Sequence, residues 1–99
     1  MSSPKLISLP TLQKVARRFS VLSEPVRLQL IQELLRGERC VNRLVEKIGC
    51  SQANVSRHLN LLYSEGVLAR RKEGVVVFYS IADPSVADLC KIVCRRLDA

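Results

Sequence analysis

The sequence has no apolar run long enough to cross a bilayer, and its first ten residues lack the apolar segment of a secretory signal peptide. Internal repeats and low-complexity segments are also missing. We therefore expect a cytoplasmic protein. Because cytoplasmic thiols are kept reduced, the four cysteines are not expected to form structural disulfides. Packing, metal binding and redox sensing remain as their roles.

Sequence signatures of the common enzyme classes are missing as well. The chain contains no Cys-x-x-Cys pair, no phosphate-binding loop, no Ser-His-acid set and no paired acids that indicate a cleft. We therefore expect a protein that is not an enzyme and requires no cofactor. It has a single histidine, His58, so any metal site must be rich in thiols.

Acidic residues are few: nine Asp and Glu stand against sixteen Lys and Arg, for a net charge of +7. This excess favours a polyanionic partner, either nucleic acid or an anionic membrane surface, although a well-solvated basic surface has the same composition. The 99 residues allow one domain, over 1–99. A domain this small buries little of its own surface, which favours a symmetric dimer.

Helical spacing of apolar residues begins after a short arm expected at 1–9. A first helix is predicted over 11–22, with one apolar face formed by Leu12, Val15, Phe19 and Leu22. Ser23-Glu24-Pro25 is a typical helix start and Gly37 a typical stop, so a second helix lies between them.

Residues 41–62 are predicted to form a helix-turn-helix. The first helix runs from Val41 to Ile48 and ends at Gly49, and the second restarts at Ser51. The inner face of this second helix consists of Val55, Leu59 and Leu62. The polar side chains expected off that face are Gln52, Asn54, Ser56, Arg57 and His58. Two short helices joined by a glycine-containing turn, the second with a polar outer face, are typical of this motif.

A β-hairpin is predicted over 67–81, with strands at 67–71 and 75–81 and a charged tip at 72–74. Asp83-Pro84-Ser85 then begins a last helix over 83–97, with Val86, Cys90, Val93 and Leu97 on one stripe. The expected fold is mainly α with a small β-hairpin (α+β), a winged helix-turn-helix whose hairpin is the wing.

Two stretches carry a resemblance to a known family. They are Leu22–Leu28 (LSEPVRL) and Ser51–Leu62 (SQANVSRHLNLL), the latter followed by Glu65-Gly66-Val67-Leu68 and the basic wing. The chain resembles the ArsR/SmtB family of bacterial metal- and metalloid-responsive repressors from about Leu12 to Leu97. The resemblance implies a homodimer built from the first and last helices. It also implies binding to an imperfect palindrome in double-stranded operator DNA, and release from DNA when an inducer binds.

The predicted DNA contacts follow from side-chain chemistry. Gln52 and Asn54 suit adenine edges and Arg57 suits guanine in the major groove. Ser51, Ser56 and His58 are suited to phosphates or base edges, with Ser51 near phosphate at the helix start. The wing cations are predicted to contact phosphate or the minor groove, and they are Arg70, Arg71 and Lys72. A solvated hairpin end, or a winged helix used only for protein contacts, is the alternative.

The cysteines are the candidate sensing residues. Cys40 starts the third helix between Arg39 and Arg43, where a thiol ionises more easily than a free one. Family members that respond to arsenicals or cadmium have Cys-x-Cys at this stretch, whereas this chain has Cys40-Val41-Asn42. Cys90 and Cys94 share a helical face and are spaced to hold one soft ion, although simple packing predicts the same stripe. Cys50 is expected to pack in the core.

Two sensing mechanisms follow as hypotheses. In one, Cys40, Cys90 and Cys94 bind arsenite or a soft metal ion as inducer; in the other, they oxidise to a disulfide or polysulfide link. Either link would join the third helix to the dimer helix, within or between subunits, and disfavour DNA binding. The family's zinc site on the last helix is not expected, because Ser85 and Arg96 occupy positions that require histidine.

Overall fold

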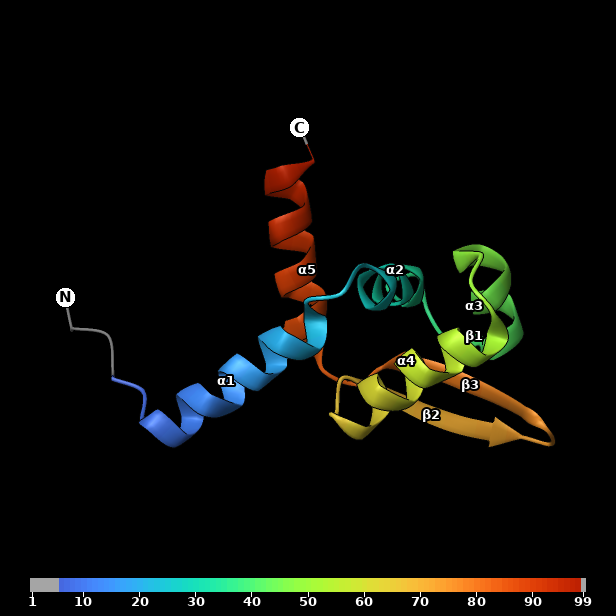
Figure 1. Ribbon diagram of the computed structural model, residues 1–99, viewed down its shortest axis with the longest axis horizontal. Coiled ribbons are helices and arrows are strands. Elements are labelled where there is room, and N and C mark those ends of the chain that lie inside the picture. The colour runs from blue at the N-terminus through green and yellow to red at the C-terminus, as the bar shows by residue number, and fades with distance from the viewer. Residues whose placement is uncertain (1–5, 99) are drawn as a thin grey trace.

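Five helices and a three-stranded sheet make up the computed structural model, which describes residues 6–98 (Figure 1). The elements in chain order are α1 (Leu9–Leu22), α2 (Pro25–Leu34), β1 (Arg39–Cys40), α3 (Val41–Ile48), α4 (Gln52–Ser64), β2 (Leu68–Glu73), β3 (Val76–Ile81) and α5 (Pro84–Leu97). This order confirms the predicted winged helix-turn-helix.

Side-chain caps and glycines set the helix boundaries. The Ser51 hydroxyl accepts a hydrogen bond from the Asn54 backbone N–H at 3.2 Å, and α3 ends at Gly49, whose φ is 79°. Ser8 caps α1 in the same way, so the helix begins at Leu9, two residues earlier than predicted. Of the arm expected at 1–9, residues 1–5 lie outside the described residues.

The sheet is antiparallel, with the strand order β1-β3-β2. The hairpin turns at Gly74-Val75, where Gly74 has a φ of 63°. The predicted tip at 72–74 is therefore wrong: Lys72 pairs with Val77 and Glu73 with Val76, so both belong to β2. The third strand, β1, was not predicted, because two residues are too short to show a periodicity.

The hydrophobic core lies where α2, α3 and α4 meet the sheet. Its largest completely buried side chains are Leu30, Ile31, Leu44, Leu59, Leu62 and Leu68. Val86 joins the same core from the first turn of α5. The core therefore holds α4 against α2 and α3 and leaves the opposite side of α4 to solvent.

Helices α1 and α5 extend away from this core in different directions (Figure 1). The domain is accordingly elongated, at 52 × 33 × 20 Å. Leu22 and Val86 of the predicted apolar faces are buried in the core, whereas Phe19 on α1 is 54% exposed and Leu97 on α5 is 77% exposed, so the outer parts of both faces lack cover within one protomer. No helix in residues 6–98 has the length and apolar character to span a membrane.

Candidate nucleic-acid interface

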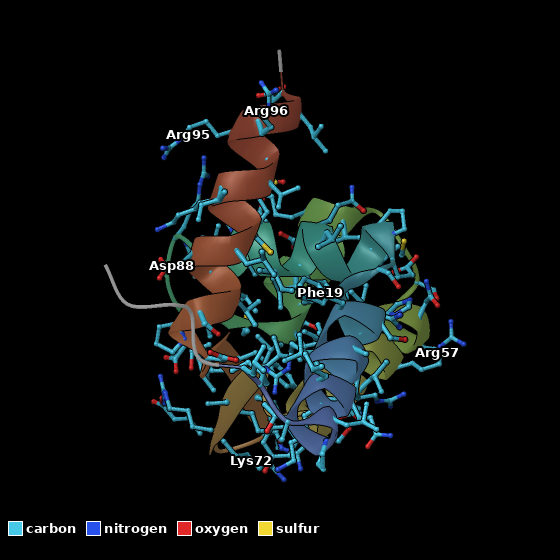
Figure 2. The ribbon with its side chains drawn as sticks, turned by 90° about the vertical axis from the view of Figure 1, so that its left-hand side faces the viewer. Phe19, Arg57, Lys72, Asp88, Arg95 and Arg96 are labelled. Atoms are coloured by element: carbon cyan, nitrogen blue, oxygen red, sulfur yellow. The ribbon has the colours of Figure 1, made fainter. Side chains whose placement is uncertain are left out.

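The exposed side of α4 carries four of the five polar residues that the sequence placed there. Gln52 and Arg57 are exposed, and Asn54 and Ser56 are half-buried. The Arg57 guanidinium donates to Oδ1 of Asn54 at 2.6 Å, which orients the arginine along the helix. Figure 2 shows Arg57 projecting from the side of the molecule. The arrangement matches a recognition helix that presents hydrogen-bonding groups to a groove of DNA.

Ser51 is the N-cap of α4, as predicted. Its hydroxyl satisfies one backbone N–H, while the helix dipole keeps this end partly positive. The same side chain is exposed, so the helix start is accessible to a phosphate. Contact of Ser51 with DNA remains a prediction.

His58 does not lie on the polar side of α4, so its predicted placement is wrong, while its contact with DNA stays a prediction. The residue is 8% exposed and packs against α2. Its Nδ1 lies 3.4 Å from a guanidinium nitrogen of Arg27, and its Nε2 lies 3.9 Å from a carboxylate oxygen of Glu24. His58 therefore joins α4 to α2 from the inner side of the helix.

A groove of about 690 Å³ separates α4 from the wing. On the α4 side it is bounded by one helical stripe, formed by Gln52, Ser56, Asn60 and Tyr63. The wing contributes Arg70, Arg71, Lys72, Val75, Val76, Val77 and Tyr79, and the end of β1 and start of α3 contribute Cys40, Val41 and Asn42. None of these described lining residues is acidic. The groove is therefore suited to an anion and not to a cation.

The three wing cations differ in what they contact. Arg71 donates to the Glu38 carboxylate at 2.7 Å and to the Glu73 carboxylate at 2.7 Å, and its guanidinium lies 4.4 Å from the centre of the Phe78 ring. The same hydrogen bonds hold the pKa of Glu38 below its usual range. Arg71 therefore stabilises the wing, and its charge is already compensated.

Arg70 and Lys72 have no ion pair within residues 6–98. Figure 2 shows Lys72 at the end of the molecule formed by the wing. Because neighbouring strand residues alternate in direction, Arg70 and Lys72 share a face that Arg71 does not. These two are the wing cations whose charge is left for a partner.

Asn60 and Tyr63 belong to the same surface but were not among the predicted contacts. The guanidinium of Arg70 lies 4.0 Å from the centre of the Tyr63 ring, and it donates to Oδ1 of Asn60 at 3.4 Å. The sequence could have predicted their position, because Asn60 and Tyr63 follow Ser56 by four and seven residues and therefore lie on the same stripe of the helix.

The candidate sensing cysteines lie in two separate parts of the fold. Cys40 is the N-cap of α3 and lines the groove, whereas Cys90 and Cys94 lie one turn apart on α5 (Figure 1). Residues 6–98 contain no cluster of three Cys, His, Asp or Glu side chains able to hold a metal ion. One protomer therefore does not bring Cys40 to the α5 pair.

The individual thiols also differ in exposure. Cys94 is exposed, while Cys90 is half-buried and packs against the core. Burial, and then the neighbouring Cys94, raise the pKa of the Cys90 thiol. Cys50 is half-buried against the core, which confirms its predicted packing role.

Comparison with known proteins agrees with this geometry. Residues 24–70 match the family model described as the bacterial regulatory protein, arsR family. A probable mercury resistance operon repressor of Streptomyces lividans is 47% identical over 84 residues, covering 84% of this chain and 67% of the relative. The chain belongs to the ArsR family.

Solved ArsR-like structures have the same fold. A homodimeric winged helix-turn-helix DNA-binding domain of Mb0332 from Mycobacterium bovis has a TM-score of 0.82 and 32% identity, over 99% of this chain and 91% of that one. An antimony-specific transcriptional repressor, AntR, has a TM-score of 0.90 and 27% identity, over 99% and 89% of the two chains. Membership of the ArsR family makes the chain a transcription regulator and not an enzyme.

Proposed function

We propose that the protein is a homodimeric repressor that binds operator DNA through α4 and the wing, and that leaves DNA when a soft metal or metalloid ion binds cysteine thiols. The groove beside α4 is the observation that supports DNA binding. Polar side chains of α4 line one side of it, and the wing cations Arg70 and Lys72, which have no ion pair within residues 6–98, line the other. None of its described lining residues is acidic.

The homodimer rests on the exposed apolar faces of α1 and α5. Leu12, Val15 and Phe19 form one apolar row on α1, and Ile92, Val93 and Leu97 remain exposed on α5. Apolar area of this extent on so small a domain is typical of an interface. The homodimeric Mb0332 domain supports a second copy of the chain as the occupant.

A two-fold dimer presents two copies of α4 to one face of DNA. Half-sites then lie about one DNA turn apart, roughly 34–36 Å. Gln52, Asn54 and Arg57 read base edges in the major groove, and Ser51, Ser56, Arg70 and Lys72 contact phosphates. The residues that read base edges give sequence specificity, and the residues that contact phosphates give the salt dependence of binding.

Cys90 and Cys94 are the proposed centre of the inducer site. They share a face of α5, which is also a dimer helix, so a bound ion acts directly on the packing between protomers. Arsenite reacts with two thiols by forming two As–S bonds and releasing two water molecules, and it needs no free thiolate beforehand. The names of the mercury and antimony repressors favour a soft ion of this class.

Cys40 takes part only if the inducer site joins two protomers, since it lies apart from the α5 pair within one. The alternative to coordination is oxidation. A peroxide or polysulfide would remove two electrons and two protons from Cys90 and Cys94 and leave a disulfide on α5. Residues four apart on a helix hold their Cβ atoms about 5–6 Å apart, farther than the roughly 3.5–4.5 Å of a disulfide, so this second candidate requires α5 to distort, and the two are separated by experiment.

The test is binding of the reduced protein to a labelled fragment of its own promoter, alone and with arsenite, mercury(II) or a polysulfide. We expect affinity to fall steeply as salt rises, because counterions are released on binding. Arsenite or mercury(II) is expected to release DNA from wild type and not from the Cys90→Ser/Cys94→Ser variant.

The Cys50→Ala variant is the matched control, since Cys50 packs against the core, and Cys40→Ser reports on the third thiol. Release by polysulfide alone would replace the coordination mechanism with the redox one. Release that survives loss of all three thiols would contradict both. Binding that does not respond to salt would indicate a protein-interaction module in place of a DNA-binding one.

A further inference from the structure

We propose that Tyr63 and Asn60 are positioning residues that hold the guanidinium of Arg70 over the groove for one DNA phosphate. The inference rests on the proposed function, because it assigns a role within the DNA-binding surface. It concerns two residues on the last turns of α4, beyond the part of the helix expected to read bases.

Three contacts define this arrangement. The Arg70 guanidinium stacks over the Tyr63 ring with 4.0 Å between Cζ and the ring centre. Oδ1 of Asn60 accepts from Arg70 at 3.4 Å and from the hydroxyl of Tyr79 at 3.3 Å. Both partners of Asn60 are donors, so its carbonyl oxygen must face them, and the buried Tyr79 anchors the amide in that orientation.

The groove is the path that a DNA strand has to take. When a helix lies in the major groove and the adjacent wing reaches the minor groove, the backbone between the two grooves passes between helix and wing. In this protein that passage is the groove lined by Ser56 and Asn60 on one side and Arg70 and Lys72 on the other. Arg70 has no carboxylate partner among the described residues, so its charge remains for a phosphate.

Positioning matters because arginine is long and mobile. A guanidinium that is already stacked on an aromatic ring loses less rotamer freedom when it meets a phosphate than one that moves freely in solvent. The stack leaves the edges of the guanidinium available, and those edges carry the N–H donors that pair with phosphate oxygens. Tyr63 and Asn60 therefore raise DNA affinity through Arg70 without carrying charge themselves.

The experiment is a double-mutant cycle read by fluorescence anisotropy on labelled promoter DNA over a series of salt concentrations. Arg70→Ala is expected to weaken binding about tenfold and to reduce the salt slope by about one unit. Tyr63→Leu is expected to weaken binding about threefold to fivefold, and Tyr63→Phe, which keeps the ring, to bind like wild type.

The decisive comparison is Tyr63→Leu in the Arg70→Ala background, where no further loss is expected because the residue to be positioned is gone. Asn60→Ala is made in a Tyr79→Phe background so that no buried hydroxyl loses its acceptor, and it too should cost nothing without Arg70. Tyr63 is 40% exposed, so the thermal midpoint of Tyr63→Leu should match wild type.

Equal losses from Tyr63→Leu with and without Arg70, or no loss in either background, would overturn the positioning role. If wild type bound with a steep salt dependence in those cases, the proposed DNA-binding function would stand. If wild type did not bind promoter DNA at all, the function and the inference would fail together.

Discussion

Asp83 shows how one side chain stabilises two parts of this domain. One carboxylate oxygen accepts from the backbone N–H of Ser85 at 3.0 Å and from its hydroxyl at 2.6 Å, capping α5. The other accepts from the Arg18 guanidinium at 2.7 Å and so ties α5 to α1. The Ser85 hydrogen bonds, followed by Arg18, hold the pKa of Asp83 below its usual range.

The first prediction concerns Asp83→Asn, which keeps the capping oxygen and removes the charge. At pH 7 we expect it to lower the free energy of unfolding by about 1 kcal/mol. Because the folded-state pKa is depressed, the stability from the charge is fully present above the unfolded-state pKa of about 3.9 and is lost as pH falls through the lower folded-state value. Urea unfolding at pH 7, 5 and 3, with the protein concentration held constant, measures the stability difference between Asp83→Asn and wild type and its decrease at low pH.

Asp88→Asn is the control for this prediction. Asp88 is exposed on the same helix and has no ion pair within residues 6–98 (Figure 2). Its replacement should change the free energy of unfolding by less than about 0.5 kcal/mol at each pH. A deficit in Asp83→Asn that stayed constant down to pH 3 would assign the effect to capping and not to charge.

His58 shows how far single residues are predictable from the sequence. It follows Val55 by three residues and precedes Leu62 by four, so helical spacing alone puts it on the inner face. Its polarity favoured the outer face, but the ring lies on the inner face because Arg27 on α2 and Glu24, the N-cap of α2, give it polar partners. Those partners lie more than thirty positions away in the chain, where sequence spacing carries no information.

At the scale of elements, the wing is defined by its strand register. Pairing of Lys72 with Val77 moves Lys72 from the expected tip into β2, where alternation places its side chain on the face of Arg70 and opposite to that of Arg71. Strand composition and a glycine predicted the hairpin, but the position of the turn depends on which residues pair. β1 exists only because β3 offers it an edge, so the local sequence of Arg39 and Cys40 did not reveal it.

The second prediction compares the wing cations through the salt dependence of DNA binding. Lys72→Ala should reduce the salt slope by about one unit, because one phosphate contact is lost. Arg71→Ala combined with Glu38→Gln removes a cation together with one of its two carboxylate partners, so the net charge of the wing region is unchanged and the slope should stay close to that of wild type. The slopes of the variants are measured by fluorescence anisotropy titrations at salt concentrations from about 50 to 200 mM.

Equal slope changes in the two wing variants would mean that Arg71 exchanges Glu38 for a phosphate when DNA binds. A thermal midpoint for each variant separates this outcome from a damaged wing. Of the two variants, only Arg71→Ala/Glu38→Gln is expected to have a lower thermal midpoint than wild type. It loses both the Glu38 contact and the packing over Phe78.

At the scale of the whole molecule, the dimer helices connect directly to the end of the recognition helix. Arg17 on α1 pairs with Glu65 at the C-cap of α4 at 2.9 Å, and Arg18 donates to the Glu65 backbone oxygen at 2.9 Å. Arg18 also holds Asp83 at the start of α5. Two polar contacts thus join α1 to the end of α4, a third joins α1 to the start of α5, and we propose these contacts as the route from the proposed thiol site to DNA.

The third prediction tests the dimer itself. Phe19→Glu places a carboxylate in the exposed apolar face of α1, and a symmetric interface would bury it twice without a partner. We expect the variant to sediment as a monomer at micromolar concentration while wild type is a dimer. Its DNA affinity should fall at least about a hundredfold, because linked binding of two half-sites is lost.

Gln29→Glu adds the same charge at an exposed position of α2, away from the apolar faces, and controls for the charge alone. It should sediment as a dimer and bind DNA within about threefold of wild type, since a single rim charge is largely screened. Circular dichroism of Phe19→Glu should keep the helix content, because Phe19 is 54% exposed within the protomer and lies outside its core. A folded Phe19→Glu dimer with normal DNA affinity would assign the apolar face of α1 to another partner and leave α5 as the only dimer helix.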